Sequence, residues 1–314
     1  MNDASQVLAV ARLLADDTSI PPEPATQGRR QPPADNPPQR TDTGEEPRLW
    51  PEIRMMIETG IRDQPREKQR EIGPSELGVD CVHCLAAKLA GWPQTRSVSW
   101  MPFIGTCVHE HFERMFGGIE RFETEMRVTV GTLNGIYGNT GLHGSIDLYD
   151  RKTGSTIDWK ITGDATIRTA KTQGPSQQYR VQASLYGIGL ENMGETCERN
   201  CIYMLPRNRT SLNDAYTWET RFDPQPGRWA MSRAQLLINL MDLIELEDGT
   251  DVRDAWIHGL PKTRTHCFQC GTWPDDNLGE ASELNTDEYP PVPDKWRRLV
   301  PLIEPTYKES ERTM

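Results

Sequence analysis

Two carboxylates and a lysine stand within a segment that has the composition of a β-hairpin. The strand-like stretches 144–150 and 155–161 are separated by Arg-Lys-Thr-Gly, which is typical of a turn. If the hairpin closes symmetrically over this turn, Asp147 falls directly opposite Asp158, with Cβ atoms about 5 Å apart. Lys160 then shares a face with Asp158, because strand side chains alternate.

Such a pair of carboxylates requires a nearby positive charge. In strand 144–150, alternation places Ile146 and Leu148 on one face and Asp147 on the other. Two facing carboxylates repel each other unless a cation lies between them, and Mg²⁺ or Mn²⁺ suits an oxygen-rich site. The alternative is a solvent-facing strand edge with scattered charges, which a single D-x-K tripeptide does not exclude.

Further chemically capable residues lie on helices before and after the hairpin. His109 and Glu113 share a face of a helix expected over residues 102–116, because they are four positions apart. Gln182 and Tyr186 have the same spacing on a helix expected over residues 175–190. Further helices are expected over 75–89 and 228–247, and further strands near 122–130, 136–142, 200–206 and 215–222. Taken singly, the histidine would be a structural residue and the tyrosine a core aromatic.

Taken together, these motifs resemble those of a known nuclease family. The series G-x-x-x-H-E-x-x-E, G-x-x-D, D-x-K and Q-x-x-x-Y, within residues 70–270, resembles the RecB-like nucleases of the PD-(D/E)xK superfamily. The resemblance is greatest to the exonuclease type found among CRISPR adaptation proteins and phage recombination genes. It implies a mixed α/β fold with a restriction-endonuclease-like core, in which helices flank a central mixed sheet.

The resemblance also implies a role for each motif. His109, Asp147 and Asp158 would hold Mg²⁺ or Mn²⁺, and the backbone carbonyl of Trp159 would complete the site. Lys160 would orient or help to deprotonate the attacking water. The glutamine and tyrosine of the last motif would position DNA or the catalytic lysine.

Two C-x₂-C pairs bracket this region. Cys81 and Cys84 precede it, and Cys267 and Cys270 follow it. Four thiolates suit a structural Zn²⁺ or a [4Fe–4S] cluster. Certain RecB-like nucleases carry an iron–sulfur cluster held by one cysteine before the core and three after it. The arrangement here is two and two instead, and we expect a [4Fe–4S] cluster, with a structural Zn²⁺ as the alternative. The other cysteines are expected to be buried apolar residues: Cys107, Cys197 and Cys201.

The charge distribution separates the ends of the chain from its centre. Of the net charge of −11, residues 1–50 carry −3 and residues 271–314 carry −5. We expect a short helix and a disordered Pro-rich linker in 1–50, a nuclease domain in 51–270, and an acidic, Pro-rich tail in 271–314 with a packing segment at 296–302. This balance argues against a protein that coats DNA broadly.

Basic residues are locally in excess just after the hairpin. Residues 160–210 hold seven basic and four acidic side chains. DNA is expected to reach the site past five of the basic ones, although each alone could be a solvated surface residue: Arg168, Lys171, Arg180, Arg207 and Arg209.

The sequence favours a metal-dependent DNA exonuclease acting on single-stranded ends, in bacterial or phage recombination, repair or CRISPR adaptation, with a recombination or adaptation protein as a partner. We expect a cytoplasmic location, in the bacterial host if the chain is phage-encoded, because no membrane span or secretory leader is recognisable. One alternative is a non-catalytic DNA-end-binding or recombination accessory module. Another is a zinc-ribbon-like interaction protein that contains D-x-K by chance.

Overall fold

The computed structural model describes residues 49–62, 72–95, 98–263, 267, 269–275 and 289–309. The chain divides into two units, Met1–Met55 and Met56–Met314, and the first is described only at residues 49–55. Helix α2 is formed by Trp50–Arg62. The short helix and most of the linker predicted for residues 1–50 lie outside the described residues. No helix in the described ranges is both long and apolar enough to cross a membrane.

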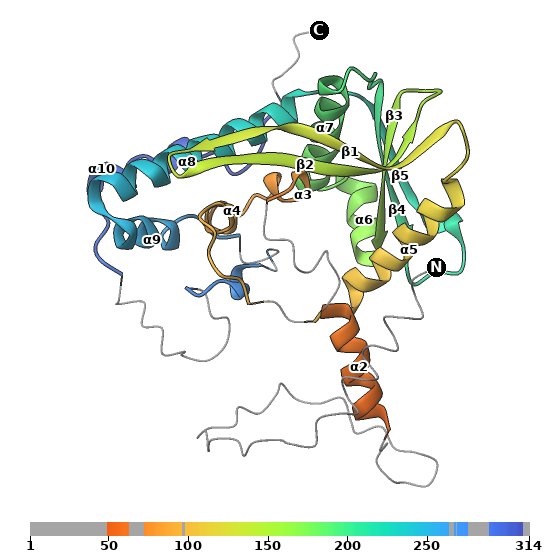
Figure 1. Ribbon diagram of the computed structural model, residues 1–314, viewed down its shortest axis with the longest axis horizontal. Helices are drawn as coiled ribbons and strands as arrows, with labels where there is room; N and C mark the ends of the chain where they lie inside the picture. Colours follow the sequence, from red (N-terminus) through yellow and green to blue (C-terminus); the bar gives the residue numbers. More distant parts are fainter. Residues whose placement is uncertain are drawn as a thin grey trace. The chain divides into compact units, whose positions relative to one another are not determined.

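A five-stranded sheet in the order β1-β2-β3-β4-β5 forms the centre of the second unit (Figure 1). Its strands are β1 Phe122–Gly135, β2 Gly138–Asp150, β3 Ser155–Thr162, β4 Arg199–Pro206 and β5 Tyr216–Arg221. Strands β3 and β4 pair in parallel, and the other neighbours pair antiparallel. The predicted mixed α/β fold, with a central mixed sheet flanked by helices, is therefore confirmed.

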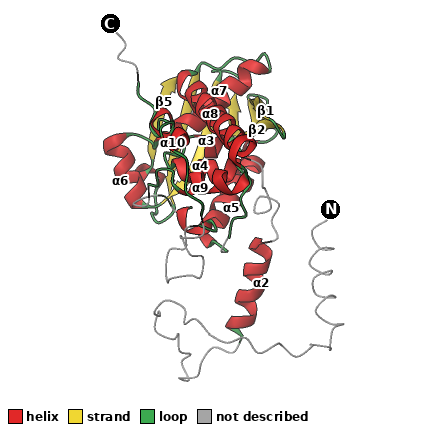
Figure 2. Ribbon diagram, turned by 90° about the vertical axis from the view of Figure 1, so that its left-hand side faces the viewer, coloured by secondary structure: helices red, strands yellow, loops and turns green. Residues whose placement is uncertain are grey.

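Helices cover both faces of the sheet. On one face, α5 (Trp100–Phe116) packs through Phe116, whose ring contacts Phe122 and Trp159. On the other face lie α6 (Asp164–Gln173) and α7 (Gln177–Asn192), which connect the parallel strands β3 and β4. Figures 1 and 2 show α8 (Gln225–Asp248) beside α7. The sheet is thus buried between α5 and the α6–α7 layer.

The largest apolar core lies around α8. It includes residues from α3 (Pro74–Leu77), α4 (Val82–Leu89) and α9 (Thr250–His258). The long β1–β2 hairpin runs along α8 (Figure 1), where the Gln235 side chain accepts a hydrogen bond from the backbone N–H of Asn134 and donates one to its carbonyl. Three short 3₁₀ helices also lie in the described ranges: η2 Leu212–Asp214, η3 Cys270–Thr272 and η5 Val300–Leu302.

Several elements differ from their sequence-based expectations. The stretches expected as separate strands near 136–142 and 144–150 form one strand, β2. The helix expected over 75–89 is divided into α3 and α4. The break includes Gly78, where an added Cβ would lie 2.7 Å from the Cα of Gln178 in α7, so only glycine permits this close approach. Helices α6 and α9 were not anticipated.

The predicted packing segment in the C-terminal tail is confirmed, and the packed region extends beyond it. Trp296, in α10 (Asp294–Arg297), is buried and accepts a hydrogen bond at its carbonyl from the indole of Trp256. Ile303 is also buried in the main core. The backbone N–H of Tyr307 then donates to the side chain of Gln177 in α7. Residues 276–288 and 310–314 of the tail lie outside the described residues.

Candidate active site

The predicted hairpin register is present in β2 and β3. Asp150 pairs with Ser155, and the ladder continues to Leu148 opposite Ile157. It ends one position before Asp147 and Asp158. There the Asp147 Oδ2 accepts a hydrogen bond from the backbone N–H of Trp159, at 2.8 Å. The strands therefore stop pairing where the two carboxylates begin.

The alternation of side chains along β2 is interrupted at Asp147, so the prediction that Ile146 and Leu148 share a face is wrong. Ile146 packs with Tyr186 of α7, whereas Leu148 packs with Ile157 on the α5 side of the sheet. The two residues therefore do not share a face. The neighbouring strand is irregular at the same level, because Glu125 has a φ of +47° and is skipped in the β1–β2 pairing. This double irregularity directs Asp147 toward α5.

The six residues predicted as ligands of Mg²⁺ or Mn²⁺ or as catalytic groups all line one cavity of about 830 Å³. They come from four elements: His109 from α5, Asp147 from β2, Asp158 and Lys160 from β3, and Gln182 and Tyr186 from α7. Residues 72–75, which include the start of α3, form part of the cavity wall. The fold thus brings together side chains that are up to 77 positions apart in the sequence.

Three of the cavity residues form a candidate metal site. Donor atoms of His109, Glu125 and Asp147 all lie within 4.8 Å of one another. The His109 Nδ1 is 3.3 Å from Oδ1 of Asp147, and its Nε2 is 3.1 Å from the carbonyl oxygen of Trp159. An ion with bonds of about 2.1 Å has adjacent octahedral ligands about 3 Å apart and opposite ones about 4 Å apart. The spacing therefore fits one small divalent cation.

A second network surrounds Lys160. Its ammonium lies 2.7 Å from Oδ2 of Asp158 and donates to Oε1 of Gln182 at 2.9 Å. The amide nitrogen of Gln182 donates to Oδ1 of Asp158 and to the hydroxyl of Tyr186. Lys160 also lies over the ring of Tyr179, 4.7 Å from its centroid. The lysine is therefore fixed in position between a carboxylate, an amide and an aromatic ring.

The cavity carries an excess of negative charge. Its lining includes five carboxylates, Glu110, Glu113, Glu125, Asp147 and Asp158, against two permanently charged cations, Arg127 and Lys160. Burial raises the pKa of Asp158 to about 6, although Lys160 favours its ionised form. Burial also raises the pKa of Glu125, and the charge of Asp147 raises it further. A cation bound here would relieve this repulsion.

In the structure, Glu125 joins His109 and Asp147 as a candidate metal ligand. Asp158, which was also predicted as a ligand, lies outside this group of three. Asp158 is in the same cavity, but its carboxylate contacts Lys160 and Gln182. Glu125 could have been found by pairing the strand near 122–130 with 144–150, which places it opposite Asp147. That pairing joins segments about 20 residues apart, and the strand motif alone does not specify it.

The five basic residues expected to guide DNA do not line the cavity. Arg180 instead forms an ion pair with Glu309, and Arg209 forms one with Asp164. The cations that line the cavity are Lys160 and Arg127. A DNA path past the five residues stays a prediction.

The two cysteine pairs meet at one point. The Sγ atoms of Cys81 and Cys270 are 3.5 Å apart, those of Cys84 and Cys267 are 3.4 Å apart, and those of Cys84 and Cys270 are 3.5 Å apart. These four thiols could hold a metal. Of the other cysteines, Cys201 is buried as expected, whereas Cys197 is half-buried and Cys107 is exposed, so that the expectation of burial is wrong for Cys107.

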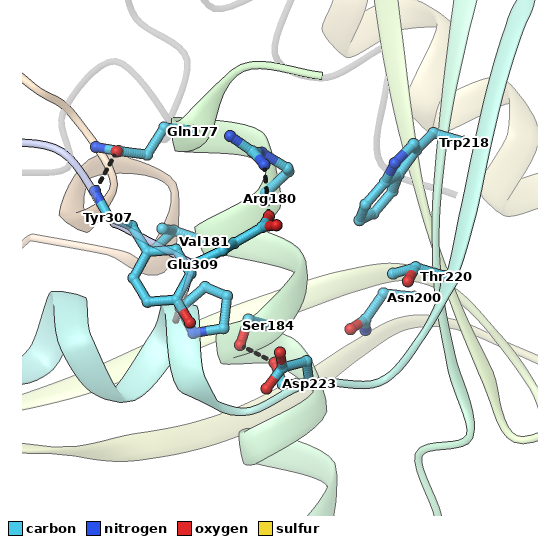
Figure 3. Close-up of a pocket in the computed structure, with 11 residues that line it drawn as sticks. Gln177, Arg180, Val181, Ser184, Asn200, Trp218, Thr220, Asp223, Tyr307 and Glu309 are labelled. Atoms are coloured by element: carbon cyan, nitrogen blue, oxygen red, sulfur yellow. Dashed lines mark hydrogen bonds and ion pairs between the residues drawn. The ribbon is translucent and has the colours of Figure 1, made fainter. Parts of the chain in front are cut away.

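A smaller pocket of about 100 Å³ lies between α7, the strands β4 and β5, and the C-terminal segment (Figure 3). Figure 3 shows Arg180 paired with Glu309, and Gln177 bonded to Tyr307. The Ser184 hydroxyl donates to the carbonyl of Asp223. The contacts of Glu309 and Tyr307 attach the C-terminal segment to α7, and none of the predicted catalytic residues lines this pocket.

Comparisons with known proteins leave the site to be interpreted from its own residues. No family model matches the chain, and no curated protein matches it. Among solved structures, the chain is similar to SSO0001, at 15% identity and a TM-score of 0.40, over 69% of this chain and 96% of that one. It is also similar to a protein from Eubacterium rectale named "Putative exonuclease", at 12% identity and a TM-score of 0.34, over 61% and 86% of the two chains.

Proposed function

We propose that this chain is a metal-dependent DNA exonuclease with a RecB-like nuclease core of the PD-(D/E)xK superfamily. The observation that carries this proposal is the arrangement of one cavity, in which the metal-competent group His109, Glu125 and Asp147 lies in the same cavity as the Lys160 network. Phosphodiester hydrolysis needs both a polarised phosphate and a nearby positive charge to offset the charge that develops on it.

The donor set suits Mg²⁺ or Mn²⁺. Two carboxylates and one imidazole, with the carbonyl of Trp159 next to the imidazole, supply mostly oxygen ligands. The bound ion would polarise the phosphoryl oxygen and lower the pKa of a water molecule. Asp158 lines the same cavity and contributes a further carboxylate near the reacting groups.

The chain's own residues then orient the reaction. Lys160 supplies a positive charge to the attacked phosphate, and its position depends on Gln182, which accepts from it and donates to Asp158. Burial raises the pKa of Tyr186, which keeps its hydroxyl neutral. This neutral hydroxyl supports Gln182 by accepting its second amide hydrogen. The network holds Lys160 in place before substrate binds.

The proposed substrate is DNA with a free end, and single-stranded ends are favoured. A role in recombination, repair or CRISPR adaptation, with a protein partner from such a system, belongs to the same proposal. The acidic cavity supports local binding of a DNA end through metal and Lys160, rather than broad binding along a duplex.

Digestion of end-labelled DNA in the presence of Mg²⁺ or Mn²⁺ tests the proposal. We expect the wild type to degrade linear single strands and the Lys160→Ala variant to lose activity by about 10²–10³-fold, because a fixed charge at the reacting phosphate is removed. Lys152→Ala, in the exposed β2–β3 turn, is the matched control and should retain full activity.

Two comparisons separate the alternatives. Covalently closed circular single strands should resist cleavage, and their digestion would show endonuclease rather than exonuclease activity. DNA-end binding by wild type without cleavage under either metal would replace the proposal with a non-catalytic accessory role.

A further inference from the structure

The four cysteine sulfurs are in direct contact. Three of the pairs lie at 3.4–3.5 Å, and all four atoms lie within 4.8 Å of one another. A tetrahedral ion with Zn–S bonds of 2.3 Å holds its ligands about 3.8 Å apart. The three closest pairs therefore need to separate by only a few tenths of an ångström to accept one such ion.

A [4Fe–4S] cluster does not fit this spacing. Each cysteine of such a cluster binds a different iron, so that two irons and a bridging sulfide separate any two cysteine sulfurs. A single bound ion would instead place only one atom between any two cysteine sulfurs. Sulfurs that already touch leave no volume for the cube of irons and sulfides, so the four cysteines would have to move apart.

The surrounding backbone opposes such a movement. Cys81 caps α4, and the N–H of His83 in that helix donates to the carbonyl of Pro261. The N–H of Cys267 donates to the carbonyl of Thr263, whose hydroxyl bonds to Asp80. Two hydrogen bonds therefore link the segment around Cys81 to the segment that precedes Cys267.

Burial also restricts the site. Cys81, Cys84 and Cys270 are each at most 1% exposed. The imidazole of His83 fills the space beside Cys84, at 3.9 Å from its sulfur, and is fixed on its other side by Asp275 at 2.8 Å. Cys267 is half-buried. A largely buried set of sulfurs of this kind is typical of a structural ion rather than of an open or exchangeable site.

We propose that Cys81, Cys84, Cys267 and Cys270 bind a single structural Zn²⁺ in tetrahedral geometry, and that the iron–sulfur cluster implied by the family resemblance is absent from this chain. Four thiolates, three of them fully buried, are a ligand set that zinc prefers in structural sites. This assignment does not depend on the proposed cleavage activity.

Metal analysis of the full chain tests the assignment. The protein is expressed with both iron and zinc in the medium and purified without oxygen, and then zinc, iron and acid-labile sulfide are measured together with the visible spectrum. We expect about one zinc per chain, no sulfide and no iron–sulfur absorption. Replacement by Co²⁺ should produce the intense visible bands of a tetrahedral thiolate site. Iron in place of zinc, with or without sulfide, would overturn the proposal.

Two variants locate the ion. Cys84→Ser should lose the zinc, whereas Cys107→Ser, which removes an exposed cysteine outside the group, should retain it. Zinc retained in full by Cys84→Ser would also overturn the assignment. If Cys84→Ser does not fold, cobalt spectroscopy of the wild type remains decisive, because the number of coordinating thiolates is read from the charge-transfer intensity.

Discussion

Glu125 occupies a backbone conformation that residues with a side chain seldom adopt. Its φ of +47° lies in the left-handed region, which costs about 1–3 kcal/mol for a non-glycine residue. Its carboxylate accepts a hydrogen bond from Ser145 at 2.6 Å and lies beside Asp147 and His109. Strain of this kind at a cluster of donors is consistent with a ligand held in place for a cation.

Replacement of Glu125 should change the stability of the metal-free protein and its affinity for the metal in opposite directions. Since burial and Asp147 both disfavour the ionised carboxylate, Glu125→Gln is expected to raise the stability of the metal-free protein. The same change should increase the Mn²⁺ concentration needed for cleavage. Thermal unfolding with chelator and a Mn²⁺ titration of activity measure the two effects.

Glu123→Gln is the control, because Glu123 is on the same strand but pairs with the exposed Arg151. It should leave the Mn²⁺ requirement unchanged. An unaltered Mn²⁺ requirement in Glu125→Gln would remove Glu125 from the proposed ligands.

The residues of the site were predictable to different degrees. Asp147, Asp158 and Lys160 lie on one hairpin, so that local alternation and turn composition placed them close together. Glu125 was not predictable in this way, because its position depends on the pairing of β1 with β2 and on an irregularity in both strands. Strand periodicity describes regular backbone and contains no signal for such a break.

At the scale of elements, Gly144 permits the close approach of three of them. An added Cβ on this β2 residue would lie 2.7 Å from the ring of Tyr186 in α7 and 2.9 Å from Pro74 in α3. Gly144→Ala should therefore displace Tyr186 and disturb the Gln182 contact that orients Lys160. We expect a decrease in kcat of about 10-fold or more, since small misplacements at a reacting centre are costly.

Gly60→Ala supplies the comparison. Gly60 is inside helix α2 and has no atom within 4 Å of an added Cβ. This change should stabilise the helix by about 0.5–1 kcal/mol and leave cleavage unchanged. Equal activity in both alanine variants would contradict the role assigned to Gly144.

The start of β1 is tied to the end of β2 by an ion pair with a definite pH dependence. Arg121 donates to both carboxylate oxygens of Asp150 and, with Thr153 and Lys152, holds the pKa of Asp150 below its ordinary value. A depressed pKa means that the folded state binds the proton less tightly than the unfolded state does. The contribution to stability is therefore complete above the ordinary value near 3.8 and is lost as the pH falls below it.

Asp150→Asn should remove this contribution. We expect a loss of about 1–3 kcal/mol at pH 7, with a smaller difference from wild type at pH 3. Urea unfolding at both pH values measures it. A difference between wild type and variant that is equal at the two pH values would show that the charge of Asp150 is not responsible.

The secondary structure was predictable where the pattern is local. Helix α5 and strands β3 to β5 match their expected positions closely because apolar periodicity or alternation marks them. Helix α6 was missed, since only Ile167 and Ala170 of its residues are buried and its apolar pattern is short. The division between α3 and α4 was missed because it depends on contact with α7, which is about 100 residues later in the chain.

For the second unit as a whole, the C-terminal segment is part of the core. Trp296 is 5% exposed, and its indole nitrogen donates to Asp248 at the end of α8. Trp296→Ala should cost about 3–5 kcal/mol, as expected for loss of a buried large aromatic side chain. Trp100→Ala, which removes a tryptophan that is 53% exposed, should cost much less. Urea denaturation of both variants tests whether the tail is needed for stability.

Contacts between cysteines up to 189 positions apart delay the assembly of one part of this molecule during its synthesis. The cavity residues 72–75 are only a few positions before Cys81, and the partners of Cys81 and Cys84 are Cys267 and Cys270. Both of these later cysteines must therefore be synthesised before the four thiols can meet beside the cavity wall. Closure over such a loop is slow and entropically costly. In a chain terminated before residue 267, we therefore expect segment 72–84 to be held less firmly, because its contacts with α7 and α8 remain but those with Cys267 and Cys270 do not form.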